Sequence, residues 1–413
     1  MKTAAIIAEY NPFHNGHRYQ IEETRRQTGA DYILILMSGD FVQRGAPALC
    51  NKYTRTRMAL LGGADAVIEL PALYALSSAE FFASGAVTLL NQLNTINLLS
   101  FGSESGNLPL LQSCAHMLTE ENSSLDGKIR EYLQQGYSYP VSRAKALSHE
   151  NIELLSSPNN ILGLEYCKAL LASNSSIIPF TLKRKDAGYH ETSFSNSATG
   201  YASASAIRNA LLKETEAAKK LSAYVPSEVY QMFESDQLSV NALSENDFSD
   251  LLHYKLLSEQ NDGFSFYLDC TSDLSDKICK YIPNYTNFTD FCNLLKSKDL
   301  TYTRISRVLM HILLNIKTPD YYRSSFKERT LYLPYARLLG FRKDSSPLLA
   351  AIKKHSNIPL ISKPANAASL LDEKALALFK QDIYCASVYE SVRFHKKNKT
   401  PLNDWKQSPI ILS

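Results

Sequence analysis

Two histidines near the start of the chain have the type and spacing to act on a phosphate group. The segment EYNPFHNGHRYQ, residues 9–20, follows the apolar stretch AAIIA and places His14 and His17 three residues apart around an Asn-Gly pair. At a helix start, this spacing brings both side chains to the same side. Neutral imidazole N–H groups there can donate to phosphate oxygens, which matters most where negative charge develops during a reaction. Two polar loop residues without a chemical role are the alternative interpretation. A zinc site is disfavoured because no third ligand of suitable spacing is apparent.

The backbone around the histidines has the features of an anion-binding turn. Asn11 and Pro12 are turn formers, and Gly16 lets the backbone approach a ligand closely. A helix that begins here points free N–H groups and a partial positive charge at an anion. The segment therefore predicts a phosphate site at a helix N-terminus.

A second polar segment follows the next apolar run. The segment SGDFVQRGAP, residues 38–47, carries Asp40, Gln43 and Arg44, which we expect over the same crevice. Arg44 can hold a carboxylate or a phosphate through two parallel hydrogen bonds. A solvated loop arginine is the competing interpretation.

Basic residues cluster in the segment NKYTRTRMALL, residues 51–61. Lys52, Arg55 and Arg57 lie along one helix start, and contact with RNA or phosphate is weighed evenly against a solvated face. Glu69 ends the following strand, and we interpret it as a structural ion-pair partner in preference to a ligand of Mg²⁺.

The elements that must position these residues alternate between short strands and longer helices. Near-continuous apolar runs such as YILIL and INLLSF are typical of strands buried on both faces. Alternation of this kind builds a parallel sheet with helices on both faces, and ligands bind beyond the carboxyl ends of its strands. The sequence thus predicts an α/β, Rossmann-like fold with strands at 3–10, 31–39, 64–71, 96–104 and 175–184 and helices at 18–29, 52–63, 77–93, 108–122, 156–173 and 203–214.

The C-terminal half of the chain has a different pattern. A helical insertion is predicted at about 124–150, and from about residue 221 the strand signals fade while apolar residues recur at helical spacing. We therefore predict a first domain over 1–220, with its boundary near 215–225, and a mainly helical domain over 221–413.

The last third of the chain is basic. From about residue 301 onward Lys and Arg outnumber Asp and Glu, with aromatic residues interleaved. This composition suits a nucleic acid's phosphate backbone and partly exposed bases, although surface lysines alone are the alternative. The residues predicted to contact RNA are Arg55, Arg57, Arg304, Arg307 and Arg342.

Composition limits the class of protein. With 413 residues the chain can bury a large core, and its net charge of +3 excludes a grossly basic protein. Seven cysteines, an odd number without a Cys-x-x-Cys pair, indicate reduced thiols in the cytoplasm. Neither a signal peptide nor a membrane span is predicted, so no membrane contact is expected.

The histidine pattern resembles the signature of a known superfamily. His-x-Gly-His, residues 14–17, is similar to the signature of the nucleotidyltransferases related to class I aminoacyl-tRNA synthetases, which attack the α-phosphate of a nucleoside triphosphate and release pyrophosphate. Their second signature half is a serine-rich turn leading into a helix after the last strand, where this chain has SASAIRN, residues 203–209. The resemblance implies that Ser203 and Ser205 bind phosphate oxygens and that Arg208 reaches the same group or braces the turn.

Further segments narrow the resemblance to one family. EYNPFHNGH, MSGDFVQRG, GADAVIELP, SPNNILGLEYCKAL and SASAIR together resemble the bacterial tRNA-Met cytidine acetate ligases over most of the chain. In that family ATP activates acetate as acetyl-adenylate, and the acetyl group passes to the exocyclic amine of the wobble cytidine of elongator tRNA-Met. The resemblance implies ATP and Mg²⁺ as cofactors, and acetate and elongator tRNA-Met as partners.

Carried over to this sequence, the resemblance implies a nucleotide site made of one continuous segment and several single residues. The segment comprises Ile7, Ala8, Glu9, Tyr10, Asn11, Pro12, Phe13, His14, Asn15, Gly16, His17, Arg18, Tyr19 and Gln20. The single residues are Gly102, Asn159 or Asn160, Arg184, Lys185, Ser203 and Arg208. The predicted catalytic residues are His14, His17, Asp40, Arg44 and Ser205.

Three other functions compete with the ligase. A cofactor-type nucleotidyltransferase that adenylates a phosphorylated small molecule resembles the first domain only and leaves the basic helical region without a purpose. An RNA-binding module with a relic nucleotide fold would tolerate the loss of His14 and His17, yet both signature halves are intact. A class I aminoacyl-tRNA synthetase is disfavoured because no Lys-Met-Ser-Lys-Ser-like loop is visible.

Overall fold

The structure is a computed structural model. It describes residues 1–119, 123–137, 142, 145–146, 157–184, 200–213, 221–235, 242–319, 331–397 and 400–413. The predicted insertion lies partly outside these residues, and within it helix α6 spans Ser123–Gln134.

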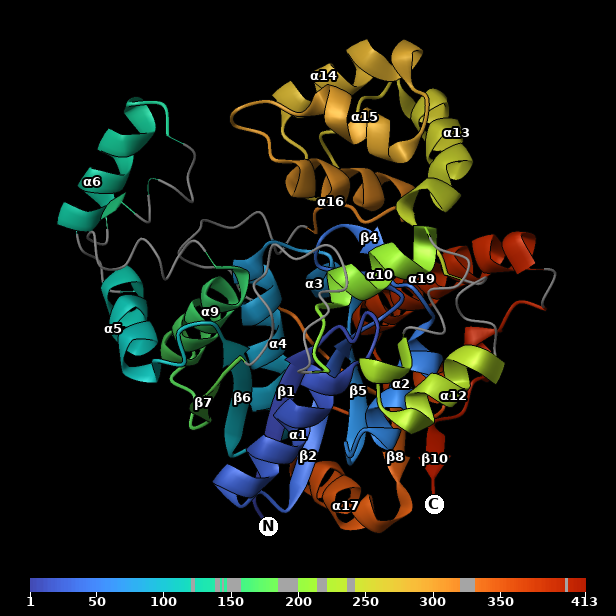
Figure 1. Ribbon diagram of the computed structural model, residues 1–413. Helices are drawn as coiled ribbons and strands as arrows, with labels where there is room; N and C mark the ends of the chain where they lie inside the picture. Colours follow the sequence, from blue (N-terminus) through green and yellow to red (C-terminus); the bar gives the residue numbers. More distant parts are fainter. Residues whose placement is uncertain are drawn as a thin grey trace.

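A mixed, mostly parallel sheet forms the centre of the molecule (Figure 1). The strand order is β10-β8-β5-β2-β1-β6-β7, with β9 paired to β8. The strands β5, β2, β1, β6 and β7 are mutually parallel, which confirms the predicted α/β class. Their bounds are β1 Thr3–Ala8, β2 Tyr32–Ser38, β5 Ala66–Leu70, β6 Leu98–Ser103 and β7 Ile178–Lys183, each within a few residues of its predicted position.

Alternate side chains of the central strands enter two separate cores. On β2, Leu34 and Leu36 belong to one core, whereas Ile33 and Ile35 belong to the other. A strand buried on both faces needs an apolar residue at every position, which is the reason for the continuous run YILIL. The first core contains helices α4 Ala79–Leu93, α5 Leu108–Thr119 and α9 Pro158–Ala172; the second contains α1 Asn15–Thr28, α2 Lys52–Leu61, α10 Ala204–Lys213 and α12 Ser227–Ser235.

The sheet extends beyond the predicted first domain. β8, Ala336–Arg342, pairs antiparallel with β5, while β9, Leu360–Ile361, and β10, Ile410–Leu412, pair parallel with β8. These three strands lie within the segment 221–413, where the sequence pattern showed fading strand signals and predicted a mainly helical domain. β9 and β10 are too short to show a periodicity, and the buried Arg337 interrupts the apolar pattern of β8.

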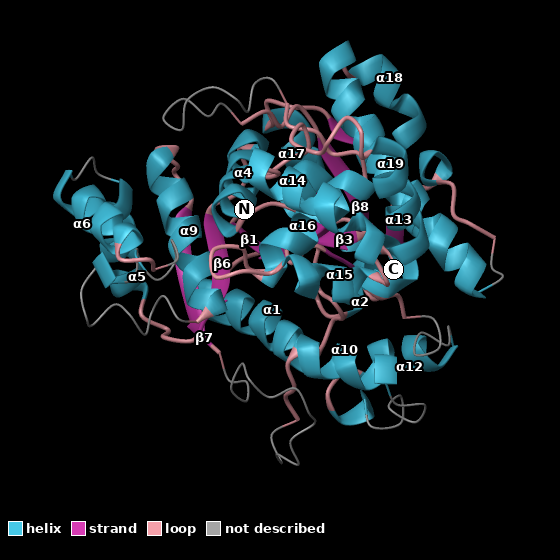
Figure 2. Cartoon of the chain, turned by 90° about the horizontal axis from the view of Figure 1, so that it is seen from above, coloured by secondary structure: helices cyan, strands magenta, loops and turns pink. Residues whose placement is uncertain are grey.

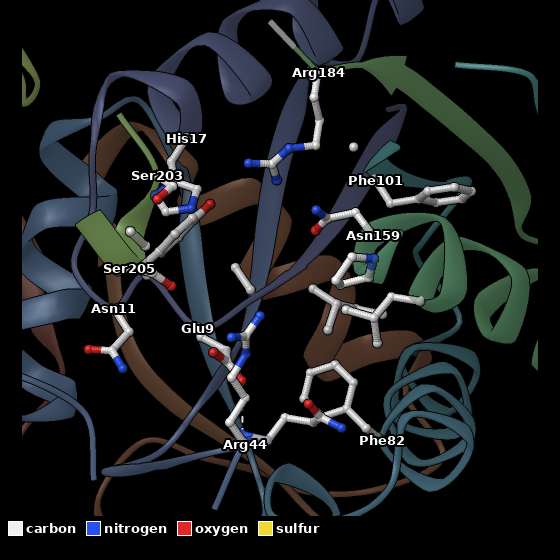
Figure 3. A pocket seen from close by; sticks show the side chains of 18 of the residues that line it. Glu9, Asn11, His17, Arg44, Phe82, Phe101, Asn159, Arg184, Ser203 and Ser205 are labelled. Carbon is white, nitrogen blue, oxygen red and sulfur yellow. Dashed lines mark hydrogen bonds between the residues drawn. The ribbon is translucent and has the colours of Figure 1, made fainter. Parts of the chain in front are cut away.

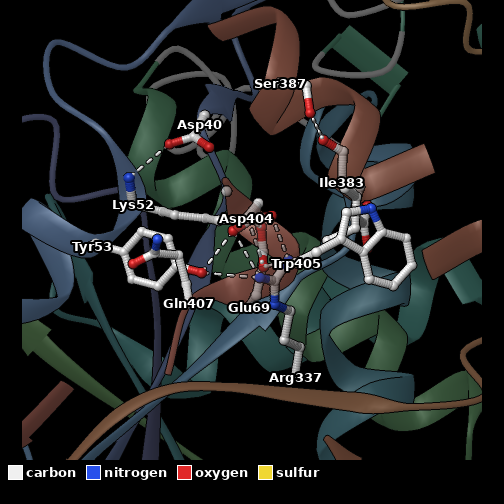
Figure 4. A network of polar contacts seen from close by, with 12 residues as sticks. Asp40, Lys52, Tyr53, Glu69, Arg337, Ile383, Ser387, Asp404, Trp405 and Gln407 are labelled. Carbon is white, nitrogen blue, oxygen red and sulfur yellow. Dashed lines mark hydrogen bonds and ion pairs between the residues drawn. The ribbon is translucent and has the colours of Figure 1, made fainter. Parts of the chain in front are cut away.

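A buried network of charges fastens these late segments to the sheet (Figure 4). Lys52 Nζ lies 2.9 Å from Glu69 Oε1 and 3.0 Å from Asp404 Oδ2, and Arg337 donates to both Asp404 oxygens at 2.8 and 2.9 Å. Although burial opposes it, Lys52 and Arg337 hold the pKa of Asp404 below its ordinary value. Glu69 is thus an ion-pair partner, as predicted. Removing one member of such a buried set costs about 3–5 kcal/mol.

Four helices lie over the edge of the sheet at which β1 and β2 end (Figures 1 and 2). They are α13 Ser249–Glu259, α14 Ser272–Tyr281, α15 Phe288–Leu295 and α16 Tyr302–Leu313. Ser306 on α16 donates to the carbonyl of Gly45 at 2.7 Å. Gly45 has φ +77°, and a Cβ atom there would lie 2.4 Å from the backbone nitrogen of Arg307. Only glycine therefore allows α16 to come this close to the turn. α16 is therefore held against the turn that follows β2.

The remaining elements complete the surface. The hairpin β3 Phe41–Val42 and β4 Ala46–Pro47 carries Gly45, and α3 Ala72–Ala75 follows β5. α17 Ser346–His355, α18 Ala367–Leu370 and α19 Glu373–Lys397 come from the last part of the chain. None of the helices in the described ranges is long and apolar enough to cross a membrane.

Candidate active site

A cleft of about 440 Å³ opens where β1, β2, β6 and β7 end (Figure 3). Thr303 at the start of α16 also lines it. Parallel strands end at one edge of the sheet, so residues that follow different strands meet there. The predicted nucleotide-binding and catalytic residues that line the cleft are Ile7, Ala8, Glu9, Tyr10, Asn11, His14, His17, Gln20, Arg44, Gly102, Asn159, Arg184, Ser203, Ser205 and Arg208.

The two histidines form a reciprocal cap at the start of α1. His14 Nδ1 accepts the Gly16 N–H at 3.0 Å, and His17 Nδ1 accepts the His14 N–H at 3.2 Å. Their rings stack with centroids 3.7 Å apart. Because both Nδ1 atoms accept hydrogen bonds, the hydrogen of each neutral ring is on Nε2, the atom left to contact a ligand.

The electrostatics keep both rings neutral. Burial, with the charges of Arg184 and Arg208, lowers the pKa of His14 to about 3. Burial, with His14 and Arg184, lowers the pKa of His17 well below its ordinary value. At neutral pH the pair therefore presents two Nε2–H donors without an imidazolium charge.

The serine-rich turn lies on the same side of the cleft as His17 (Figure 3). Ser203 Oγ accepts the Ala206 N–H at 3.1 Å at the start of α10. Arg208 donates to the Asn11 carbonyl at 2.6 Å and to Ser205 Oγ at 3.0 Å. Of the two predicted roles for Arg208, bracing the turn is the one with visible contacts, and it ties the two signature halves together.

The two asparagines at the start of α9 have different surroundings. Asn159 lines the cleft, and its amide donates to Glu104 Oε1 at 2.7 Å. Asn160 is buried, and its side-chain oxygen accepts the Ser105 N–H at 3.1 Å. Asn159 is therefore the one placed to meet a ligand, and Asn160 holds the loop after β6.

A small depression adjoins the cleft beside the histidines. Its additional lining residues include the predicted Gly16 and Tyr19, together with Leu182, Lys183 and Tyr201. Since Gly16 has no side chain, a flat group can lie against the backbone of the first helical turn.

Four members of the predicted segment 7–20 lie outside the lining of the cleft and of the depression. The Phe13 ring packs against Gly62 so closely that a Cβ atom on that glycine would lie 2.2 Å from the ring. The Asn15 amide donates to the Gly200 and Ala223 carbonyls at 3.0 and 3.1 Å. Arg18 pairs with Glu22 at 2.9 Å. Pro12 is buried beside them and does not line the cleft.

Two predicted site residues are structural. Asp40 is buried, does not line the cleft, and accepts the backbone N–H of Lys52 at 2.7 Å. Burial raises the pKa of Asp40 to about 7, although the charges of Lys52 and Arg55 act to lower it. Arg55 is fully buried and donates to the carbonyls of Glu9, Ser38, Gly39 and Cys50. The prediction of RNA contact for Arg55 is therefore wrong, because helical spacing does not reveal which face of α2 is buried, and the position of Asp40 outside the cleft lining gives no support to a catalytic role for it.

The other predicted RNA contacts are scattered. Arg57 is exposed on α2, and Arg304 and Arg307 are half-buried on α16, near the cleft. Arg342 ends β8 and pairs with Asp344 at 3.3 Å. Because β8 runs antiparallel to β5, Arg342 lies at the sheet edge opposite the cleft. Lys185 lies outside the described residues.

An apolar wall that sequence reasoning missed closes the side of the cleft near Asn159 (Figure 3). In the sequence these residues look like ordinary helix and strand core positions, so no local signal identifies them. The wall consists of Ala79 and Phe82 on α4, Phe101 on β6, and Ile161, Leu162 and Tyr166 on α9.

The described residues contain no group of three His, Cys, Asp or Glu side chains that could hold a metal ion. Glu9 is the only acidic residue among the described residues that line the cleft. A Mg²⁺ ion usually keeps several waters and binds through substrate phosphates with one or two carboxylates. The lining is therefore compatible with Mg²⁺ that arrives with a nucleotide, and offers it no cage of protein ligands.

Comparison with known proteins gives matches over the whole chain. The model of a family described as HIGH Nucleotidyl Transferase matches residues 1–404. The chain is 38% identical over 418 residues to tRNA(Met) cytidine acetate ligase of Clostridium novyi (strain NT), with 100% of each chain covered. It is 39% identical over 370 residues to the protein of the same name from Geobacillus sp. (strain WCH70), which covers 89% of this chain and 90% of that one.

Two solved structures have the same fold over their full length. They are crystal structures of Thermotoga maritima TmcAL, one bound with alpha-thio ATP and one apo. Their TM-scores are 0.89 and 0.91 and their identities 27% and 28%, with 100% of both chains covered in each case. The α/β nucleotidyltransferase fold predicted from the signature is thereby confirmed.

Proposed function

The chain belongs to the HIGH nucleotidyltransferase family, among the tRNA(Met) cytidine acetate ligases, and on this premise we propose that it uses ATP to acetylate the wobble cytidine of elongator tRNA-Met. Acetate is the acyl donor, and acetyl-adenylate is the intermediate. The observation that carries the proposal is the meeting of both signature halves in one cleft, through the hydrogen bond from Arg208 to the Asn11 carbonyl at 2.6 Å. A nucleotide in the cleft contacts the histidine pair and the serine turn together.

In the first step, the acetate carboxylate attacks the α-phosphate of ATP and pyrophosphate leaves. The Nε2–H groups of His14 and His17 donate to the oxygens on which charge builds, and their neutral state does not change near pH 7 because their pKa values are lowered. Ser203, Ser205 and the N-terminus of α10 bind the departing phosphates. Arg44 holds the carboxylate in line for attack.

In the second step, the exocyclic amine of cytidine attacks the acetyl carbonyl and AMP leaves. The apolar wall contributed by α4, β6 and α9 excludes water, which would otherwise hydrolyse the mixed anhydride. The same wall offers Phe82 and Tyr166 as surfaces for a flipped-out base or for the acetyl methyl group. Mg²⁺ supplies positive charge to the triphosphate when bound, and it arrives with the nucleotide.

The tRNA approaches over α16, whose first turn borders the cleft through Thr303. Arg304 on that helix and Arg57 on α2 are the proposed phosphate contacts, with Arg307 behind them at the Gly45 turn. Arg342 is left out of this surface because it lies at the opposite edge of the sheet. Since the tRNA substrate is cytoplasmic, the protein acts there.

One experiment tests the proposed function. The protein is incubated with ATP, labelled acetate and total bacterial tRNA, and the digested RNA is searched for acetylated cytidine. We expect label in cytidine of tRNA-Met, together with AMP and pyrophosphate. ADP and phosphate as products would refute attack at the α-phosphate. Absence of acetylated cytidine, with adenylation of a phosphorylated small molecule, would instead establish the cofactor-type transferase.

A further inference from the structure

Glu9 has an unusual position for a residue of an ATP site. It follows β1 directly, and its carboxylate lines the cleft beside Arg44, on the side away from Arg184 (Figure 3). Its Oε1 accepts the Gln43 N–H at 2.8 Å. No described residue forms an ion pair with it, so part of a half-buried negative charge remains available to a ligand.

The triphosphate and acetate are poor partners for this carboxylate. Both are anions, and a carboxylate close to them raises the free energy of binding by charge repulsion. Of the three arginines that line the cleft, Arg184 and Arg208 lie on the histidine side, where they lower the pKa of His14, and Arg44 lies beside Glu9 (Figure 3). Glu9 lies closer to the apolar wall, and its charge adds to the effect of burial in raising the pKa of Tyr166. The histidine side of the cleft therefore carries positive charge without a lining carboxylate, whereas the other end carries the one lining carboxylate of the described residues together with Arg44.

The acceptor amine is the substrate group that a carboxylate suits. An ionised carboxylate only accepts hydrogen bonds, and glutamate is a natural partner of the N4 amino group of cytosine. The lone pair of this amine is delocalised into the ring, which makes it a weak nucleophile. Once it has attacked, the nitrogen carries an extra proton that must leave before the product is stable. A positioned base therefore accelerates the step.

We propose that Glu9 binds the exocyclic amine of the acceptor cytidine and removes its proton during acetyl transfer; this role rests on the proposed function. The N4 atom forms a bond to the acetyl carbon, and the bond between that carbon and the AMP oxygen breaks, with its electron pair going to AMP. One N4 proton moves to the free oxygen of Glu9 and later to water. The Gln43 N–H holds the other oxygen and fixes the direction of the carboxylate.

The substitution Glu9→Gln tests this role in the full-length protein. The glutamine oxygen still accepts the Gln43 N–H, so the turn keeps its anchor while the base is lost. We expect acetate-dependent exchange of pyrophosphate into ATP to stay within about threefold of wild type, and kcat for tRNA acetylation to fall about 10²- to 10⁴-fold. Hydroxylamine, a strong nucleophile that needs no base, should capture the acetyl group equally well with both proteins. Glu22→Gln, on the exposed side of α1, serves as the matched control and should change neither reaction.

Each outcome decides between roles. Loss of pyrophosphate exchange in Glu9→Gln would overturn the proposal and place Glu9 with ATP or its Mg²⁺. Unchanged tRNA acetylation would also overturn it. A fall in kcat for acetyl transfer at an unchanged KM for tRNA, with unimpaired capture of the acetyl group by hydroxylamine, is a result that a merely structural residue would not produce. A wild-type protein that exchanges pyrophosphate but never acetylates tRNA would refute the proposed function itself.

Discussion

His14 caps a helix and is proposed to act in catalysis, and two substitutions distinguish these roles. Its Nδ1 caps α1 by accepting the Gly16 N–H at 3.0 Å, while Nε2 is left to contact the nucleotide. In His14→Asn, the side-chain oxygen can still cap the helix, because asparagine is among the preferred N-cap residues. The amide is too short to replace Nε2 in the cleft. In His14→Ala, both interactions are lost.

The expected magnitudes follow from these contacts. Loss of the cap costs about 1 kcal/mol of stability, so His14→Ala should unfold at lower denaturant concentration than His14→Asn. Loss of one donor to developing charge costs about 10²- to 10³-fold in rate, and both variants should show this loss. ATP affinity should change little, because the donor acts mainly on the transition state.

Two measurements check this reasoning. Denaturant unfolding compares the stabilities, and pyrophosphate exchange at saturating ATP and acetate compares the rates. If His14→Asn exchanged pyrophosphate as fast as wild type, the catalytic role would be excluded and only the cap would remain. If the ATP affinity fell while the rate at saturating ATP stayed unchanged, the histidine would bind the ground state and the transition state equally.

Three further predictions address pH, burial and RNA binding. The pKa of His14 is about 3 in the folded state against 6.5 for a free histidine, so unfolding takes up a proton and stability is lost as the pH falls below about 6.5. The free energy of unfolding changes with pH by up to about 1.4 kcal/mol per pH unit. Denaturant unfolding measured between pH 7 and pH 4 should show a smaller change in His14→Asn. Arg55→Met should lower the free energy of unfolding by about 3 kcal/mol or more because it leaves buried carbonyls unpaired, whereas Arg57→Met at an exposed position should have almost no effect in the same assay. Arg304→Ala should make the slope of log tRNA affinity against log salt concentration shallower by about one unit, while Arg342→Ala should leave that slope unchanged. A wild-type slope in Arg304→Ala as well would exclude α16 from the RNA surface.

The candidate site was partly visible in the sequence because its central motifs are local. The spacing of His14 and His17 and the serine turn before α10 are short patterns whose chemistry follows from residue type, and both halves line the cleft. The predicted strands were found for a similar reason. A strand buried on both faces, such as β2, has to be apolar throughout, and this leaves a continuous run in the sequence.

The failures have a common cause in long-range contacts. Asp40 and Arg55 carry the charges typical of functional residues, but the fold buries both, and backbone groups are their hydrogen-bond partners. Phe82 and Tyr166 were missed for the opposite reason, since a helix residue in a cleft wall has the same pattern as one in a core. Neither case leaves a signal in neighbouring residues.

By itself, the sequence determined the fold class, the helices that connect the parallel strands and the two signature motifs, because each depends on residues close together in the chain. Only the tertiary structure decided which charges are buried, which residues wall the cleft and how the last strands complete the sheet. β8 joins β5 through the pair of Arg337 and Glu69, and Asp404 pairs with Lys52, and no local pattern reveals pairs separated by hundreds of residues. Burial is a property of the folded chain, and for a charged side chain the compensation for leaving water comes from partners that only folding brings together.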